Sequence, residues 1–426
     1  MKRVLIICYY WPPAGGPGVQ RWLKFVKYLR DFNIQPFLFV PENAHYPLVD
    51  ESLIQEVPTG IEIIRFPIKE PYRFAKWFSK SKTKKMSSGI ISEKKPSFIE
   101  RFLLYIRGNF FIPDARVNWV KPSVGFLRKY LSEENIDTII TTGPPHSLHL
   151  IGLQLKAESG VKWMADFRDP WTSIHYHKSL RLSEASEKKH KKLEKEVLQN
   201  ADHVVVTSKG TAAEFQQITN RPISVITNGY DISEEIIVEG DKKFSLVHVG
   251  SLLNERNPKV LWQVLSELIE EEEGFSNDFE LKLAGALGQE VLTAIDNYGL
   301  THLTNNLGYV STKEATRLMH SAQLLLLVEM DKEETKVILP GKLFEYLNAR
   351  RPILAIGPRD SDITEIIEET RSGDYYSYSD ISAIKNKIKD SYHRYKAGTL
   401  EIESVKVEKY HRRELTSHLA QLIKGL

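Results

Sequence analysis

The first loop of the chain has the residue types that bind an anion. An apolar run at 4–8 is typical of a parallel strand buried on both faces, and it leads into a turn rich in proline and glycine. Gly15 and Gly16 lie in this turn, directly before an amphipathic helix. Unpaired amides and the dipole at a helix N-terminus attract negative charge. The sequence predicts a phosphate-bearing substrate; the alternative is a plain strand-to-helix connection.

Two well-known phosphate-binding fingerprints are not matched. After Gly16 and Gly18, Arg21 stands where a dinucleotide-binding loop has its third glycine. Gly341 and Lys342 are followed by leucine, so the Ser or Thr that holds magnesium in a P-loop is missing. These departures disfavour both a dehydrogenase and a P-loop NTPase.

Polar residues that could act on a substrate follow two later predicted strands. His146 and Asp169 each lie just beyond such a strand, where α/β sheets bind their ligands. In the alternative interpretation, Asp166 and Asp169 cap the following turn and pair with Arg168. His248 lies inside a strand, and we expect it to be a core residue.

Length and composition indicate a globular protein of two or three domains. The chain has 426 residues, of which 42% are hydrophobic, with a mean hydropathy of −0.31. No apolar run reaches the length of a transmembrane helix, and the N-terminal run is too short for a signal peptide. The single cysteine, Cys8, allows no internal disulfide. We therefore expect a cytoplasmic protein.

Strand-like and helix-like segments alternate along the chain, which predicts an α/β protein with mostly parallel sheets. Strands are expected at 4–8, 35–40, 61–66, 138–142, 163–167, 203–207 and 223–226, and then at 244–249, 279–284, 303–307, 324–328 and 353–356. The pattern breaks near 232–242. We predict domains at 1–235 and 236–405, and a terminal helix at 406–426 that could pack on either domain.

An insertion at 69–121 carries a strong positive charge. Its 69–107 segment has eleven Lys and Arg residues against three Glu, a net charge of +8, with aromatic residues such as Trp77 and Phe78 between them. Such a segment suits anionic lipid headgroups. The alternative is a solvated insertion flanked by core helices. Because no nucleic-acid-binding motif accompanies the charge, we do not expect nucleic acid as a partner.

Six segments, in order over nearly the whole chain, resemble a known enzyme family. They are YYWPPAGGPGVQR, TGPPHSLHLIG, DFRDPW, VITNGYD, HVGSLLNERNP and PGKLFEYLNARRPIL. The chain resembles retaining nucleotide-sugar glycosyltransferases of the GT-B fold, of the family 4 type, and more narrowly bacterial enzymes of envelope polysaccharide biosynthesis. The resemblance implies two facing Rossmann-like, doubly wound domains. The first would bind a glycan or lipid-linked acceptor and receive the C-terminal helix, and the second would bind a UDP- or GDP-sugar.

The resemblance implies a donor site around the helix that starts near residue 341. Glu345 would bind the ribose hydroxyls, because a carboxylate accepts two hydrogen bonds from a diol. Pro340, Gly341 and Lys342 would bind the diphosphate at the helix N-terminus. The alternatives are an exposed helix glutamate and a solvated first-turn lysine.

The resemblance also implies cations after the first strand of the second domain. Arg256 and Lys259 follow the strand end at Gly250 and would neutralise the leaving diphosphate. Gly15 and Gly16 would approach the donor phosphates from the first domain. A surface arginine and an ordinary helix lysine are the alternatives for the two cations.

The chain departs from the family at two positions. Val337 replaces the first of two family glutamates, which contacts the donor sugar, and Ser251 replaces a frequent arginine. Glu333 or Glu334 could substitute for the missing glutamate from a shifted loop. The departures support a catalytically silent binding scaffold as one alternative. A UDP-sugar 2-epimerase of similar fold is another.

The mechanism implied by the resemblance is hexosyl transfer with retained anomeric configuration and no enzymatic nucleophile. Asp169 would contact the acceptor hydroxyl beside His146, and Arg256 would stabilise the leaving group. No cofactor and no metal are expected. Asp360 and Asp362 match an Asp-x-Asp metal pattern of a different glycosyltransferase fold. Asp362 with Glu365, however, indicates a helix capping box.

The basic insertion leads to the first testable prediction, peripheral binding to the inner face of the plasma membrane. We expect co-sedimentation with anionic but not neutral vesicles, because each basic residue near an anionic surface contributes about 1 kcal/mol. Salt should weaken the binding, and so should replacement of Lys80, Lys82, Lys84 and Lys85 by Ser. If the wild-type protein ignores anionic vesicles at low salt, the segment is only a solvated insertion.

Overall fold

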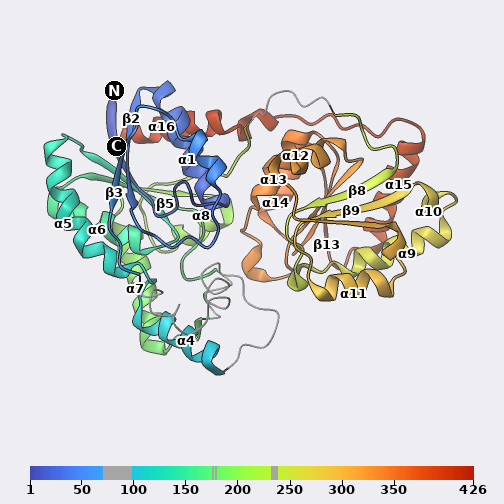
Figure 1. Cartoon of the computed structure of the whole chain (residues 1–426), viewed down its shortest axis with the longest axis horizontal. Helices are drawn as coiled ribbons and strands as arrows, with labels where there is room; N and C mark the ends of the chain where they lie inside the picture. Colours follow the sequence, from blue (N-terminus) through green and yellow to red (C-terminus); the bar gives the residue numbers. More distant parts are fainter. Residues whose placement is uncertain (71–97, 175–176, 178–179, 232–237) are drawn as a thin grey trace. The chain divides into compact units, whose positions relative to one another are not determined.

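The computed structural model describes residues 1–70, 98–174, 177, 180–231 and 238–426 (Figure 1). The chain divides into two compact units. Unit 1 comprises Met1–Thr227 and Arg412–Leu426, and unit 2 comprises Asn228–His411. The divisions fall after residues 227 and 411. The sequence analysis, in contrast, expected boundaries after residues 235 and 405.

Unit 1 is built on a seven-stranded sheet in the order β3-β2-β1-β4-β5-β6-β7. Every pair of neighbours is parallel. Residues 4–7 of the central strand β1 are all fully buried, as their apolar run predicts. The strands are β1 (Lys2–Ile7), β2 (Ile34–Pro41), β3 (Glu62–Phe66), β4 (Thr138–Gly143), β5 (Lys162–Phe167), β6 (His203–Val206) and β7 (Ile223–Val225).

The helices of unit 1 start and end at residues with recognisable caps. The side chains of Ser183 and Ser208 accept hydrogen bonds from backbone amides in the first turns of α7 and α8. Gly160, with φ of 68°, ends α6. The helices are α1 (Pro17–Leu29), α4 (Phe98–Phe110), α5 (Val117–Glu133), α6 (Ser147–Ser159), α7 (Glu184–Asn200), α8 (Lys209–Gln216) and α16 (Arg412–Gly425).

The C-terminal helix α16 belongs to unit 1 although it follows unit 2 in the sequence. It lies beside α1 (Figure 1). Leu419, Ala420 and Ile423 are buried in the core on the α1 face of the sheet. Lys2 Nζ also donates to the carbonyl of Ile423 at 2.7 Å. An amphipathic helix gains most of its stability from such burial.

Unit 2 has a six-stranded parallel sheet in the order β10-β9-β8-β11-β12-β13. Its strands are β8 (Phe244–Val249), β9 (Phe279–Ala284), β10 (Thr304–Gly308), β11 (Leu324–Val328), β12 (Ile353–Gly357) and β13 (Gly373–Ser377). Its helices are α9 (Lys259–Glu271), α10 (Phe275–Asp278), α11 (Gln289–Asn297), α12 (Thr312–Ser321), α13 (Gly341–Ala349), α14 (Asp362–Thr370) and α15 (Ile381–Lys396).

Short 3₁₀ helices complete the two units. They are η1 (Arg30–Phe32), η2 (Glu51–Glu56), η4 (Asn254–Arg256), η5 (Thr301–Leu303), η6 (Glu333–Thr335) and η7 (Val407–Tyr410). In the part of the chain that the structure describes, no helix combines the length and apolar character needed to span a bilayer.

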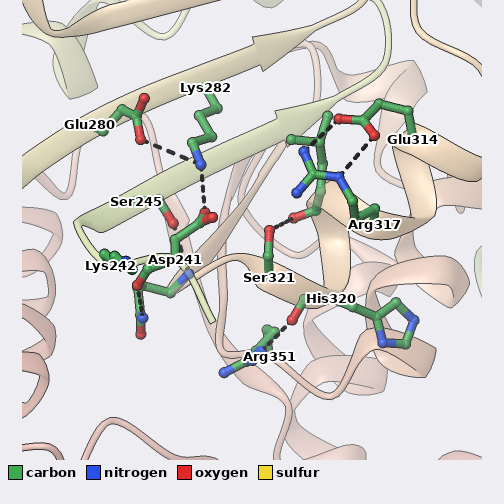
Figure 2. Close-up of polar contacts among 12 residues, drawn as sticks. Asp241, Lys242, Ser245, Glu280, Lys282, Glu314, Arg317, His320, Ser321 and Arg351 are labelled. Carbon is green, nitrogen blue, oxygen red and sulfur yellow. Dashed lines mark hydrogen bonds and ion pairs between the residues drawn. The ribbon is translucent and has the colours of Figure 1, made fainter. Parts of the chain in front are cut away.

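A network of polar contacts ties the start of β8 to its neighbours (Figure 2). Lys282 of β9 reaches Asp241 at 2.9 Å and Glu280 at 3.4 Å. The Asp241 amide donates to the carbonyl of Ser321, at the end of α12, at 2.8 Å. These contacts fix the segment that enters unit 2 against the amino ends of the strands.

The predicted α/β class with parallel sheets is confirmed. Strand β13 and helix α15 were not predicted, because β13 is a half-buried edge strand and α15 is rich in lysine. The capping prediction for α14 is wrong by one residue. Ser361, rather than Asp362, is the N-cap, and its side chain accepts from the Ile363 amide.

A buried ion pair joins α1 to β5 in unit 1. Arg21 Nη2 lies 2.8 Å from Asp166 Oδ1, and both side chains are at most 2% exposed. Trp22 and Thr142 also donate to Asp166, at 2.7 and 2.8 Å. Burial alone would raise the pKa of Asp166, but the Arg21 charge and these hydrogen bonds hold it below its usual value. The alternative interpretation, in which Asp166 pairs with Arg168, is therefore wrong for Asp166.

We predict that Arg21→Met destabilises unit 1 by about 3–5 kcal/mol, because it leaves a buried carboxylate without its counter-charge. Arg3→Met is the matched control, since it breaks a pair whose two side chains are each 36% exposed, worth about 0–1 kcal/mol. Urea unfolding followed by tryptophan fluorescence measures the difference, because six of the seven tryptophans lie in the unit 1 sequence. Equal stability of the two variants would contradict the prediction.

The same pair makes the stability of unit 1 depend on pH. Because the pKa of Asp166 is lowered in the folded state, its contribution is present above the unfolded pKa of about 3.9. This contribution to the free energy of unfolding should be lost as the pH falls through the pKa of Asp166 in the folded protein.

Candidate functional site

Four ionisable side chains meet near the carboxyl ends of β8 and β11 in unit 2. Arg256 comes from η4, Glu329 directly follows β11, Lys342 lies in the first turn of α13, and His248 is in β8. Arg256 Nη2 lies 3.2 Å from Glu329 Oε2. Lys342 Nζ lies 3.5 Å from His248 Nε2. Parallel strands place their carboxyl ends at one edge of the sheet, which is where α/β proteins bind ligands.

Gly250 allows the Lys342 ammonium to lie against the backbone just beyond β8. Its φ is 126°, and a Cβ at this position would stand 2.3 Å from Lys342 Nζ. On the other side, a Cβ at Gly285 would meet the Gly250 carbonyl oxygen at 2.2 Å. Position 250 therefore requires glycine for two reasons: its positive φ, and the room that the Lys342 ammonium occupies.

The electrostatics of this cluster favour an anionic ligand. Burial, together with the nearby Arg256 charge, lowers the pKa of Lys342 to about 8. Burial and the Lys342 charge hold the pKa of His248 well below its usual value. The Nδ1 atom of His248 lies 2.9 Å from the Leu326 carbonyl oxygen. His248 is thus the buried histidine that the sequence predicted, and it also contacts Lys342.

The N-terminus of α13 opens beside the same cluster. Pro340 is the N-cap and provides no side-chain cap, and Gly341 begins the helix. The Leu343 amide donates to the Pro340 carbonyl at 3.0 Å, and the two amides before it, those of Gly341 and Lys342, can bind an anion. Glu345 lies one turn further, exposed to solvent, and its charge raises the pKa of Lys342.

The remaining predicted donor residues of unit 2 lie in different surroundings. Lys259 begins α9 and is exposed. Among the described residues, Glu329 forms its ion pair with Arg256 and none with Lys259. Val337 is half-buried between η6 and α13, and the exposed Glu333 pairs with Lys336 at 2.8 Å.

Glu329 is the residue that sequence reasoning missed. It is 2% exposed and is the carboxylate in contact with Arg256. Burial raises its pKa, while the charges of Arg256 and Lys342 oppose the rise. The available signal was a glutamate directly after the apolar run 324–328, at the carboxyl end of a strand.

In unit 1, the glycine-rich turn packs against a neighbouring loop. The Gly15 amide donates to the Leu48 carbonyl at 3.0 Å, so this amide is already used within the protein. Gly16 is the N-cap of α1, with φ of 96°. A Cβ at Gly18 would stand 1.9 Å from Arg168 Nη1. The first turn of α1 is thus open enough to receive the guanidinium of Arg168.

His146 is buried at the carboxyl edge of the unit 1 sheet, as the N-cap of α6. It is 7% exposed, and neither ring nitrogen has a hydrogen-bond partner among the described residues. Its ring stacks on Trp171, with centroids 4.8 Å apart and planes 2° apart. Burial holds its pKa well below the usual value, so the ring is neutral. Both nitrogens of this neutral imidazole are buried and without a partner in the described part of the chain, so the ring keeps one hydrogen-bond donor and one acceptor unused.

Asp169 and Arg168 follow β5, the strand adjacent to β4 and His146. Asp169 is half-buried, and Arg168 donates to the Pro144 carbonyl. The structure thus brings His146, Arg168 and Asp169 to neighbouring strand ends in unit 1. No group of three or more His, Cys, Asp or Glu side chains among the described residues has the arrangement of a metal site.

Comparison with known proteins gives a family match over part of the chain and several structures of similar fold. Residues 90–234 match the model of Glycosyltransferase Family 4. Sucrose-phosphate synthase from Thermosynechococcus elongatus is 15% identical, with a TM-score of 0.61 over 100% of this chain and 99% of its own. HepE from Anabaena, in complex with UDP and glucose, is 12% identical, with a TM-score of 0.63 over 100% of both chains.

A third similar structure is a putative UDP-N-acetylglucosamine 2-epimerase from Listeria monocytogenes. It is 12% identical, with a TM-score of 0.56 over 100% of this chain and 96% of its own. A search of curated proteins found no match. At these identities the structural likeness shows the fold alone. That fold is the two-sheet GT-B fold, and together with the match over residues 90–234 it confirms the resemblance to glycosyltransferases of the family 4 type with the GT-B fold.

Proposed function

We propose that this chain, a glycosyltransferase with a family 4 domain, transfers a hexosyl group from a UDP- or GDP-sugar to a hydroxyl of a glycan or lipid-linked acceptor. The observation that carries the proposal is the pair of cations, Arg256 and Lys342, beside the N-terminus of α13. Two cations and unpaired helix amides suit a diphosphate that gains charge as it leaves. A second structure of HepE is a complex with UDP-glucose, which supports this donor class.

The proposed reaction retains the anomeric configuration. The bond between the anomeric carbon and the diphosphate oxygen breaks, and the acceptor oxygen bonds to that carbon on the same face. The acceptor proton passes to the departing phosphate, so no enzymatic nucleophile is required. Arg256 and Lys342 stabilise the leaving charge, and no metal is needed for that task.

The proposed acceptor residues lie in unit 1. Asp169 would accept a hydrogen bond from the acceptor hydroxyl, and His146 would donate to or accept from the sugar. Both lie at carboxyl ends of adjacent strands, which supports a shared substrate site there.

We further propose that the enzyme acts in bacterial surface polysaccharide synthesis while bound to the inner face of the plasma membrane. Residues 71–97, which hold most of the basic segment, lie outside the described residues. Helix α4 follows them, and its Tyr105 and Phe110 are 43% and 73% exposed. Exposed aromatic side chains next to a basic segment suit the headgroup region of an anionic bilayer.

Incubation of the purified protein with single nucleotide sugars, with and without an acceptor glycan, tests the function. We expect acceptor-dependent transfer that persists in EDTA, with the anomeric configuration assigned by NMR. Epimerised nucleotide sugar formed from the donor alone would instead identify a 2-epimerase. Binding without turnover would identify a silent scaffold. Activity that is lost in EDTA and restored by Mn²⁺ would contradict the metal-independent mechanism.

We predict that Glu345→Gln weakens UDP or GDP binding by about 1–3 kcal/mol, because the ribose hydroxyls lose a charged hydrogen-bond partner. Glu368→Gln, which changes an exposed glutamate on α14, is the matched control and should leave affinity unchanged. Isothermal titration calorimetry measures both. If the two variants bind with wild-type affinity, Glu345 does not contact the ribose.

A further inference from the structure

Glu329 occupies a position that needs a functional explanation, because an ionisable carboxylate is costly to bury. Its backbone is fixed by the sheet: the Glu329 amide donates to Ile356 O at 2.9 Å, and Tyr378 Oη donates to Glu329 O at 2.7 Å. A Cβ on Gly357 would approach Glu329 Cβ to 3.3 Å, so the neighbouring strand leaves it little room. The side chain is thus held in one place, with Oε2 toward Arg256.

The surroundings of Lys342 show why a carboxylate is useful there. Lys342 Nζ lies 3.5 Å from His248 Nε2 of β8, and its ammonium is within electrostatic reach of Arg256 from η4, Glu329 from beyond β11 and Glu345 on its own helix. Arg256 disfavours the charged lysine by repulsion, and the neutral His248 can only accept a hydrogen bond from it. Glu329 and Glu345 favour the charged form. Glu345 is exposed, so solvent screens its effect, whereas Glu329 is not screened.

We propose that Glu329 is a positioning residue that holds Arg256 in place and keeps the Lys342 ammonium protonated, so that both cations are ready for the diphosphate. The role rests on the proposed function, because it concerns the same phosphate site. Without the buried carboxylate, two cations would stand beside each other without a counter-charge. Lys342, the one that can lose a proton, would then do so at lower pH.

The inference is tested in the free protein by measuring the pKa of Lys342 itself. Trace acylation with acetic anhydride over a range of pH, quantified by mass spectrometry of the Lys342 peptide, reports the fraction of neutral amine. We expect a midpoint near pH 8 in the wild type. In Glu329→Gln, which keeps the shape and one acceptor oxygen but removes the charge, the midpoint should fall by about one unit or more.

Glu255→Gln is the matched control. Glu255 precedes Arg256, but its side chain is 63% exposed and pairs with Lys332, so the same loss of charge is screened. We expect its Lys342 midpoint to stay at the wild-type value. An unchanged midpoint in Glu329→Gln, or equal shifts in both variants, would overturn the inference.

Nucleotide affinity provides the second readout. UDP binding to the wild type should weaken as the pH rises through about 8, and the decline should begin at lower pH in Glu329→Gln. Lys342→Arg should remove the decline, and Glu329→Gln added to it should not restore it, because arginine stays charged. If no variant binds UDP or GDP at any pH, the proposed function fails, and the acylation midpoint still decides the role of Glu329. A decline at the same pH in both Glu329→Gln and the wild type would overturn that role.

Discussion

Parallel pairing of the strands is the constraint on which both candidate sites depend. All strand neighbours in the two sheets are parallel, so every strand of a sheet ends at the same edge. Residues far apart in the sequence, such as His146 and Asp169 in unit 1, therefore reach adjacent positions. Crossover helices begin at that edge, which adds the unpaired amides of helix N-termini such as that of α13.

Burying charged groups at the edge of a sheet costs desolvation free energy. The two units offset this cost through different contacts. In unit 1, Asp166 is fully satisfied by Arg21, Trp22 and Thr142, so this carboxylate serves the fold. In unit 2, Glu329 contacts Arg256 through one oxygen, and a second cation stands nearby. The interactions of Asp166 are thus all made within the protein. Around Glu329, in contrast, the positive charges of Arg256 and Lys342 exceed its negative charge and can attract an anionic ligand.

Local sequence patterns determined the elements of this protein. Apolar runs delimit β8, β9 and β11 at the residues predicted. These elements are predictable because burial on both faces, or on one helical face, is a property of neighbouring residues. The edge strand β13 gives a weaker signal, since its residues are only half-buried. The six resembling segments also contain Arg256 and Lys342, which lie near the carboxyl ends of β8 and β11 in the structure.

Tertiary structure alone decided which charges pair. Asp166 pairs with Arg21, 145 residues away, and not with its neighbour Arg168. Glu329 pairs with Arg256, 73 residues away, whereas the sequence analysis had named Glu333 and Glu334 from the same loop. The partner of a buried carboxylate depends on which strand ends the sheet order brings together, and on which of them exclude water. Neither property is encoded in the spacing of residues along the chain, because both arise only when the strands are assembled.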